Sequence, residues 1–276
     1  MKKGNTLTSL KPAQAIPQLA TAFDVSGVGL CIQDNTILSN VTLEFPAGEV
    51  VALVGHNGSG KSSLLKILGR QQSPTSGTVT CSGHALDHYG DRDFARAVAY
   101  LPQDLSTGLE MTVRELVGCG RYPWHGALGR FSEIDKGKVD AALAATHIEM
   151  LAERLVGTLS GGERQRAWIA MLVAQDARCL LLDEPTAALD VAHQIEVLSL
   201  VRRLAHEGGR SVVIVLHDIN MAARFCDRIH ALNHGHVVAS GTPADILVPE
   251  TLYDIYGIDM NVIAAPNLNH PLAYAC

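Results

Sequence analysis

The stretch that most constrains this chain is the octapeptide Gly55–Ser62, which fits the phosphate-binding loop pattern GxxxxGK[ST] at every fixed position. The apolar run Val50–Val54 precedes it, and a second run, Leu64–Leu68, follows. A short buried strand that enters a glycine turn and opens a helix is the context in which this pattern holds nucleotide phosphates. The alternative, a glycine-rich turn carrying a surface lysine, is disfavoured because both flanking elements are present.

A loop of this kind predicts a role for its residues. The backbone N–H groups between Asn57 and Ser62 are expected to point at phosphate oxygens, assisted by the positive end of the helix that begins there. Lys61 is expected to place its charge at the β- and γ-phosphates, and the Ser62 hydroxyl to ligate Mg²⁺. The residues expected to bind the nucleotide here are Gly55, His56, Asn57, Gly58, Ser59, Gly60, Lys61, Ser62 and Ser63.

Two adjacent carboxylates follow a second apolar run. Cys179–Leu182 is continuously apolar, as a strand buried on both faces should be, and Asp183 and Glu184 come directly after it. Open α/β sheets bind their ligands at the carboxyl ends of their strands. Asp183 is therefore expected to ligate Mg²⁺ and Glu184 to face the attacking water, the alternative being two surface acids at a strand end.

His217 ends another apolar run, Ser211–Leu216. A lone histidine at a strand end is more often structural than catalytic. Here the strand is expected to run parallel to the one before Asp183, and this favours a role for His217 at the γ-phosphate.

Ser160-Gly161-Gly162-Glu163 predicts the start of a helix. Ser160 and Glu163 have capping-box spacing, which explains a helix start without any ligand. A capping box does not require Gly161 and Gly162, because glycine costs backbone entropy unless something must come close. We therefore interpret this helix N-terminus as a second anion site.

Asp190 is expected to cap a later helix. The apolar stripe of that helix is expected to consist of Val191, Ile195, Leu198, Val201 and Leu204.

The remaining pattern predicts an α/β fold, namely a P-loop NTPase core with an antiparallel β layer and an inserted helical subdomain. Alternation over residues 40–45 predicts a strand with one wet face, and residues 78–81 and 98–101 predict further strands. The inserted subdomain is expected at about 105–160. Within it, Thr112 and Glu115 fit a capping box.

Two further stretches of this subdomain differ in their expected structure. Residues 136–151 carry a second helical pattern. Residues 120–126 are too rich in glycine and aromatics for an ordinary helix. For the whole chain we expect a disordered leader over 1–22, one ATPase domain over 23–257 and a tail over 258–276, with Ala264–Cys276 unstructured.

Composition excludes several other classes of protein. The net charge of −6 argues against nucleic acid as a partner, and no apolar run approaches the roughly 20 residues of a membrane span. Six scattered cysteines are consistent with free thiols in a reducing cytosol. His230, His234 and His236 lie beside Asn233 and Gly235, which favours a solvated turn over a metal site.

Taken together, these motifs resemble those of ABC transporter ATPase subunits over about residues 23–257. The stretches 114–116 and 120–131 look like the helical subdomain of iron-siderophore importers, most closely the ATP-binding subunit of the iron(III)-hydroxamate (ferrichrome-type) importer. The motifs that carry the family resemblance are Gly55–Ser62, Gln103, Leu159–Glu163, Leu182–Pro185, Ala188–Asp190 and His217.

The resemblance implies a homodimer that sandwiches two ATP molecules. Ser160 and Gly162 would contact the γ-phosphate held by the opposite subunit, and Asp190 would face the opposite P-loop. Gln103 would sense Mg²⁺ and the attacking water, so the catalytic residues implied are Glu184, His217 and Gln103.

The resemblance also implies partners and a location. The helical subdomain would dock on a membrane permease at the cytoplasmic face of the inner membrane, making the chain a peripheral subunit. An extracytoplasmic substrate-binding protein would act indirectly.

Two departures from the family pattern concern Glu163, where glutamine is frequent, and Ile32, where many relatives stack an aromatic ring on adenine. A missing base stack is worth roughly 1–3 kcal/mol, so preference for ATP over GTP is less constrained than phosphate binding.

Alternatives remain within and beside this family. An importer ATPase for another siderophore, haem or vitamin B12 would have similar motifs. A soluble ABC ATPase of iron-sulfur cluster assembly would not need the aromatic, glycine-rich stretch 122–131. A DNA-repair or chromosome ATPase would need a long coiled coil between the P-loop and Ser160, and the sequence has none.

Overall fold

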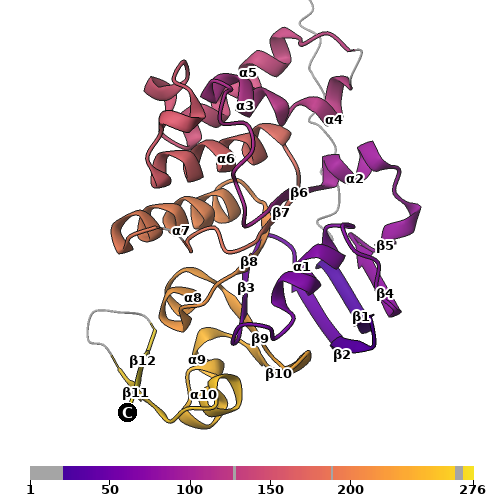
Figure 1. Ribbon diagram of the computed structural model, residues 1–276, viewed down its shortest axis with the longest axis vertical. Coiled ribbons are helices and arrows are strands. Elements are labelled where there is room, and N and C mark those ends of the chain that lie inside the picture. Colours follow the sequence, from indigo (N-terminus) through magenta and orange to yellow (C-terminus); the bar gives the residue numbers. More distant parts are fainter. Residues whose placement is uncertain (1–20, 127–128, 188, 265–269) are drawn as a thin grey trace, which may run out of the picture.

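A six-stranded sheet forms the centre of the computed structural model, which describes residues 21–126, 129–187, 189–264 and 270–276 (Figure 1). The strand order is β10-β9-β3-β8-β7-β6, with all strands parallel except the edge strand β10. Every residue of β3, β7 and β8 is buried, in agreement with their continuously apolar sequences. The strands are β3 (Val50–Val54), β6 (Val98–Leu101), β7 (Cys179–Leu182), β8 (Ser211–Val215), β9 (Arg228–Asn233) and β10 (His236–Gly241).

A second, antiparallel sheet of four strands has the order β2-β1-β4-β5, which confirms the predicted antiparallel layer. In β2, Val41, Leu43 and Phe45 are buried and the residues between them are not, so the predicted alternation is also confirmed. The strands are β1 (Thr21–Ile32), β2 (Asn35–Pro46), β4 (Ser76–Cys81) and β5 (His84–Ala85). Because β1 begins at Thr21, the expected end of the leader at residue 22 is wrong; residues 1–20 lie outside the described part.

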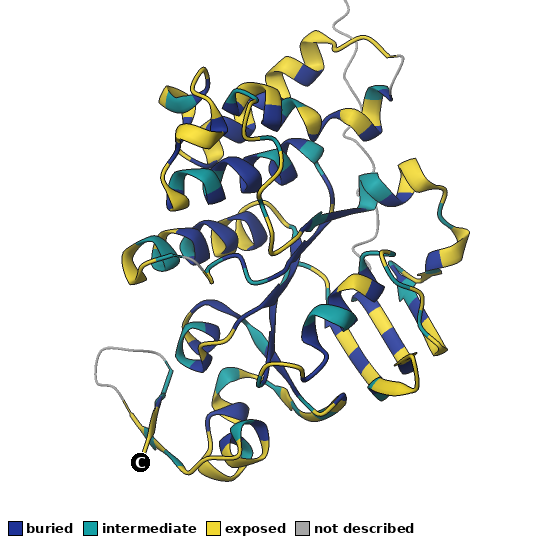
Figure 2. Cartoon of the chain, viewed as in Figure 1, coloured by how far each residue is buried: buried dark blue, intermediate teal, exposed yellow. Residues whose placement is uncertain are grey.

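Alternate residues of the central strands contribute to two separate cores. Val51 and Leu53 face the helix α1 (Lys61–Leu68) and the antiparallel sheet, whereas Val50, Ala52 and Val54 face the helices on the other side. Figure 2 shows the central strands buried along their length. The helices of the second core include α6 (Gly161–Gln175), α7 (Val191–His206) and α8 (Ile219–Phe225).

In the helical region between β6 and β7, the helices α3 (Val113–Cys119) and α5 (Glu133–Ala145) pack on α6. Helix α3 has the predicted capping box of Thr112 and Glu115. Two expectations differ from the structure: residues 120–126 contain the one-turn helix α4 (Tyr122–His125), and the second helix, α5 (Glu133–Ala145), starts earlier and stops earlier than 136–151. The early start follows from Ser132, which caps α5 through a box with Asp135.

Two short 3₁₀ helices, η2 (Glu149–Leu151) and η3 (Val156–Thr158), complete this region. Before β6, the chain forms η1 (Leu86–His88) and α2 (Asp91–Ala97).

The expectation that Ala264–Cys276 is unstructured is wrong for Leu272–Ala275, which form a strand, and residues 265–269 lie outside the described part. After α9 (Pro243–Ile246) and α10 (Pro249–Tyr256), β11 (Met260–Ile263) pairs with β12 (Leu272–Ala275). Asn220 in α8 donates from Nδ2 to the carbonyl of Ala273 at 2.9 Å and accepts from its N–H at 2.8 Å. This tertiary contact fixes a strand too short to show a sequence pattern.

Two further expectations are wrong in detail. His230 does not lie in a solvated turn but is buried in β9, where its ring nitrogens lie 2.9 Å from Ser240 Oγ and 3.0 Å from the Glu44 carbonyl. Burial lowers the pKa of His230 to about 4. In α7, Val191 is 62% exposed because it is the first residue of the helix, while Leu198, Val201 and Leu204 are buried as predicted.

Candidate nucleotide-binding site

The predicted site residues follow four neighbouring strands at one edge of the central sheet. The P-loop follows β3, His217 follows β8, Asp183 and Glu184 follow β7, and Gln103 follows β6. Since β3, β8, β7 and β6 are adjacent and parallel, their carboxyl ends lie side by side. The predicted parallel pairing of the strands before Asp183 and His217 is thereby confirmed.

Three glycines shape the P-loop for different reasons. A Cβ at Gly55 would lie 2.0 Å from the Leu232 carbonyl oxygen, and one at Gly60 would lie 2.5 Å from Leu38 Cδ2. At Gly58 no atom lies within 4 Å of such a Cβ, but its φ of 78° favours glycine. Gly55 and Gly60 therefore allow close packing against β9 and β2, while Gly58 allows the turn.

The Lys61 side chain is held inside this loop. The residue is 4% exposed, and Nζ donates to the carbonyls of Gly55 and His56, each at 2.9 Å. Burial lowers the pKa of Lys61, and the charges of Glu184 and Asp183 oppose that effect. A buried ammonium that is bonded only to carbonyls, within the described residues, fits an anionic phosphate close by.

Ser62 and Asp183 form a pair of oxygen ligands suited to Mg²⁺. The Ser62 hydroxyl donates to Asp183 Oδ1 at 2.8 Å, and Asp183 is 3% exposed. Tyr100 donates its hydroxyl to the other carboxylate oxygen, Oδ2, at 3.2 Å, and burial raises the pKa of Tyr100. The described residues contain no cluster of three or more His, Cys, Asp or Glu side chains that can hold a metal. This donor set fits Mg²⁺ bound mainly through phosphate and water, with one or two protein oxygens.

Glu184 is contacted from two sides. Gln103 Nε2 donates to Oε2 at 2.7 Å, and His217 Nε2 lies 2.8 Å from Oε1. The structure thus brings the three predicted catalytic side chains together.

The turn between β9 and β10 supports the back of the P-loop. His56 Nε2 lies 2.6 Å from Asn233 Oδ1, and the Gly235 N–H donates to the Ser59 carbonyl at 3.1 Å. The hydroxyl oxygen Oγ of Ser59 is buried and has no hydrogen-bond partner among the described residues, whereas Ser63 is half-buried in α1. The sequence analysis missed Asn233, Gly235 and Tyr100, because nothing in a strand or turn pattern shows which distant residue it will contact.

The predicted helix start at Ser160 is confirmed. Ser160 Oγ accepts from the Glu163 N–H at 3.3 Å, and the Ser160 N–H donates to Glu163 Oε2 at 2.9 Å. A Cβ at Gly162 would lie 2.4 Å from His193 Cδ2, so packing against α7 already favours a glycine here. Gly161 is exposed, and a Cβ there would meet nothing nearer than 3.5 Å, so only Gly161 remains without a structural reason.

Asp190 caps α7 as predicted. Its Oδ1 accepts from the His193 N–H at 2.9 Å and lies 2.8 Å from His193 Nδ1. Within the described part of one chain, no hydrogen bond joins Ser160, Gly161 or Asp190 to the P-loop. Gly161 instead lines a depression of about 390 Å³ that also contains Gln103 and Glu184.

Ile32, at the expected adenine position, is the last residue of β1 and is 43% exposed. It offers an aliphatic contact surface in place of an aromatic ring.

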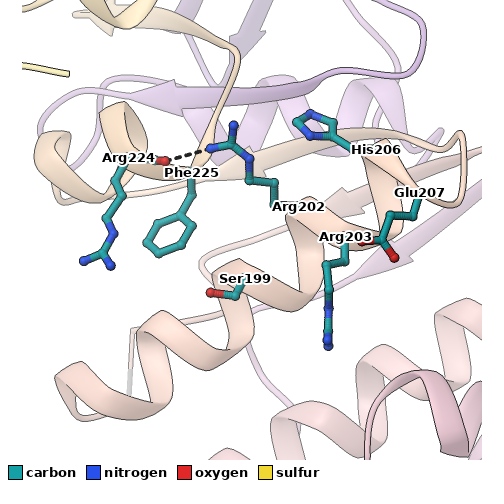
Figure 3. Close-up of a pocket in the computed structure, with 7 residues that line it drawn as sticks. All are labelled: Ser199, Arg202, Arg203, His206, Glu207, Arg224 and Phe225. Atoms are coloured by element: carbon teal, nitrogen blue, oxygen red, sulfur yellow. Dashed lines mark hydrogen bonds between the residues drawn. The ribbon is translucent and has the colours of Figure 1, made fainter. Parts of the chain in front are cut away.

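A second depression lies at the C-terminal end of α7 and is not a nucleotide site of this kind (Figure 3). It has a volume of about 390 Å³ and is lined by Arg202, Arg203, His206 and Arg224, with Arg202 Nη1 donating to the Arg224 carbonyl at 2.9 Å. Because β8 begins just after this helix end, the depression lies at the opposite edge of the sheet from the P-loop. Cations at a helix C-terminus stabilise the helix, which accounts for this cluster.

Comparison with known proteins gives consistent results. A family model described as ABC transporter matches residues 38–187. The ferric enterobactin transport ATP-binding protein FepC of Escherichia coli (strain K12) is 43% identical over 86% of this chain and 88% of its own length. The hemin import ATP-binding protein HmuV of Pseudomonas putida (strain KT2440) is 44% identical over 91% of this chain and 98% of its own. The iron(3+)-hydroxamate import ATP-binding protein FhuC of Bacillus subtilis (strain 168) is 39% identical over 89% of this chain and 91% of its own length.

Solved structures agree with this fold. An inward-facing ABC transporter described as of the metal-chelate type has a TM-score of 0.81 and 27% identity, covering 93% of this chain and 97% of that one. The dimeric structure of a bacterial ABC transporter cassette has a TM-score of 0.70 and 29% identity, and the match covers 80% of this chain and 98% of that one. The P-loop NTPase fold predicted from the sequence is confirmed.

Proposed function

The chain belongs to the ABC transporter family of ATP-binding proteins, and on that premise we propose that it is the ATP-hydrolysing subunit of an importer for iron chelates. The observation that carries the proposal is the convergence of Lys61, the Ser62–Asp183 pair and Glu184 at one sheet edge. Members of this family bind ATP and couple its hydrolysis to transport. This chain has the side chains for that chemistry at the carboxyl ends of neighbouring strands.

In the proposed reaction, ATP lies along the P-loop, with the Lys61 ammonium at the β- and γ-phosphates. Ser62 and Asp183 would hold Mg²⁺, which would supply charge neutralisation at the phosphates. Glu184 accepts the proton of the attacking water, and Gln103 and His217 orient its carboxylate. Most of the rate enhancement then comes from positioning and charge stabilisation.

We propose that the active form is a homodimer. Ser160 and Gly161 make no contact with the P-loop of their own chain among the hydrogen bonds of the described residues, so a second copy is needed to present that helix N-terminus to the nucleotide. The likeness to a dimeric ABC cassette supports this arrangement.

We propose that a membrane permease docks on the helical region. Four apolar or aromatic side chains on α4, on α5 and between these helices are exposed: Tyr122, Trp124, Phe131 and Ile134 are 54%, 41%, 43% and 73% exposed. We call these four residues the aromatic patch. Exposed aromatic clusters of this kind mark protein interfaces. No described helix is long and apolar enough to cross a membrane, so the permease would place this chain as a peripheral subunit at the cytoplasmic face.

The substrate class follows from the relatives only at a coarse level. Proteins that carry names for enterobactin, hemin and hydroxamate transport are 39–44% identical to this chain, so the shared class is an iron chelate. Import of iron(III)-hydroxamate remains a prediction within that class. An extracytoplasmic binding protein would deliver the chelate to the permease.

The test is affinity purification of the tagged chain from detergent-solubilised membranes of its native cell, followed by mass spectrometry. A stoichiometric polytopic permease is the expected partner, and chelates that stimulate ATP hydrolysis by the reconstituted complex identify the substrate. Recovery of the chain with cytosolic iron-sulfur assembly proteins only would contradict the importer and leave the ATPase chemistry intact.

A further inference from the structure

Asp183 uses both carboxylate oxygens for hydrogen bonds to protein side chains. Oδ1 accepts from Ser62 at 2.8 Å, and Oδ2 accepts from the Tyr100 hydroxyl at 3.2 Å. A carboxylate held by one oxygen can still rotate about its Cβ–Cγ bond, whereas two bonds to different oxygens fix its plane. Tyr100 is therefore the contact that determines which way Oδ1 faces.

The Tyr100 ring is itself held by packing. It lies in β6 opposite Leu181 of β7, and a Cβ added to Gly69, the residue that ends α1, would lie 2.9 Å from its Cδ2. The ring thus occupies the space beside the end of the P-loop helix. From this position its hydroxyl reaches Asp183 Oδ2.

One strand positions both acids of the site. Tyr100 contacts Asp183, and Gln103, three residues further along the same segment, contacts Glu184. The metal-binding and water-facing carboxylates are thereby oriented from β6 and the loop that follows it.

We propose that Tyr100 is a positioning residue for the divalent metal of the nucleotide complex, its hydroxyl fixing the Asp183 carboxylate beside Ser62. The proposal rests on the function proposed above. Residues that orient a metal ligand typically change metal affinity by about 10- to 100-fold when mutated. The aromatic ring keeps its packing role in a Phe variant, so hydroxyl and ring can be tested separately.

The experiment measures Mn²⁺ binding to the full chain saturated with ADP, from the electron paramagnetic resonance signal of free Mn²⁺. Tyr100→Phe should raise the Mn²⁺ dissociation constant about tenfold, while ADP binding in EDTA and the thermal midpoint stay unchanged. Tyr89→Phe is the matched control, because Tyr89 donates its hydroxyl to the Cys81 carbonyl at 2.9 Å in the antiparallel sheet. It should bind Mn²⁺ like the wild type.

An Asp183→Ala background separates positioning from a general effect on the fold. There Tyr100→Phe should cause no further loss of Mn²⁺ affinity, because its action passes through Asp183. Wild-type Mn²⁺ affinity in Tyr100→Phe, or an equal loss in both backgrounds, would overturn the inference. Absence of ADP and Mn²⁺ binding by the wild type would instead overturn the proposed ATPase.

Discussion

His217 Nε2 lies 2.8 Å from Oε1 of Glu184, a residue whose own backbone has the left-handed φ of 49°. Left-handed conformations are uncommon for residues other than glycine and cluster at functional sites. The carboxylate therefore lies beyond the end of β7 and is oriented by Gln103, which follows β6, and His217, which follows β8. In the proposed function this carboxylate faces the attacking water.

Glu184→Gln should preserve nucleotide binding and remove most hydrolysis. The amide keeps the size of the side chain but cannot accept the proton of water, and general-base catalysis contributes about 100- to 10,000-fold. ATP turnover and the dissociation constant of a fluorescent ATP analogue are the two measurements. Parallel loss of both would contradict the assignment of Glu184 as the base.

Lys61→Ala should weaken nucleotide binding itself. A charge-assisted hydrogen bond contributes about 1.5–3 kcal/mol, which corresponds to an increase of about 10- to 100-fold in the dissociation constant for ATP. Lys66→Ala is the matched control, because Lys66 is an exposed lysine on the same helix. The measurement is the equilibrium dissociation constant for ATP of each variant. Equal values for Lys61→Ala and Lys66→Ala would contradict the role of Lys61.

Gly162→Ala should destabilise the fold through α7. The new methyl group would lie 2.4 Å from His193 Cδ2 and displace the ring from Asp190, at a cost of about 1 kcal/mol or a few degrees in thermal midpoint. Gly161→Ala, with no atom nearer than 3.5 Å, should melt like the wild type.

Adding His193→Ala to Gly162→Ala removes the steric clash, so the double variant should melt like His193→Ala alone, which already lacks the ring contact with Asp190. If Gly162 also binds phosphate across a dimer, ATP hydrolysis should remain impaired in this double variant. Full recovery of hydrolysis would show that Gly162 serves packing alone.

Tyr122→Ala should impair permease binding and leave ATP binding intact. Loss of one interface anchor weakens binding about tenfold or more. Tyr253→Ala is the control, since Tyr253 is 53% exposed on α10 and Tyr122 is 54% exposed in the aromatic patch. Co-sedimentation with native membranes measures the difference. Trp124 is a less selective target, because its indole N–H donates to the Gln175 carbonyl at 2.7 Å and so stabilises the fold.

Asp135→Asn should destabilise the protein in a pH-dependent way. Asp135 and Arg121 form a buried ion pair at 2.9 Å, with side chains 6% and 4% exposed, and breaking such a pair costs about 3–5 kcal/mol. Burial acts to raise the pKa of Asp135, but hydrogen bonds from Ser132 and Arg121 outweigh it and hold the pKa at about 2.

The ordinary pKa of aspartate, about 3.9, is higher than this folded value. The stabilisation by Asp135 is therefore fully present above pH 4 and is lost as the pH falls through 2. Urea unfolding at pH 6 and pH 3 should show a smaller difference between wild type and Asp135→Asn at the lower pH. A difference that grows on acidification would contradict this pairing.

Local sequence signals predicted the strands, caps and loops that depend on nearby residues. The capping boxes at Thr112 and Ser160, the cap at Asp190 and the buried strand before Asp183 are all local patterns, and all are confirmed. The grouping of the site residues at one edge of the sheet was also predictable, because the carboxyl ends of parallel strands lie at the same edge.

Contacts between distant segments were not predictable in this way. Gly162 pointed to a ligand in the sequence, but in the structure it accommodates His193, and such a contact depends on how α6 and α7 pack. The same holds for Tyr100 with Asp183, for buried His230, and for β12. In each case the partner is remote in sequence, so no periodicity records it.

The paired hydrogen bonds between Asn220 and Ala273 place the carboxyl end of the chain in mechanical contact with the helix that begins two residues after His217. Chain ends usually tolerate trimming and fusion because little depends on them. Here removal of β12 would leave the Asn220 side-chain amide without its two partners, in the first turn of the helix that follows His217. Deletions that reach Ala273 therefore change the surroundings of α8 as well as the last strand itself.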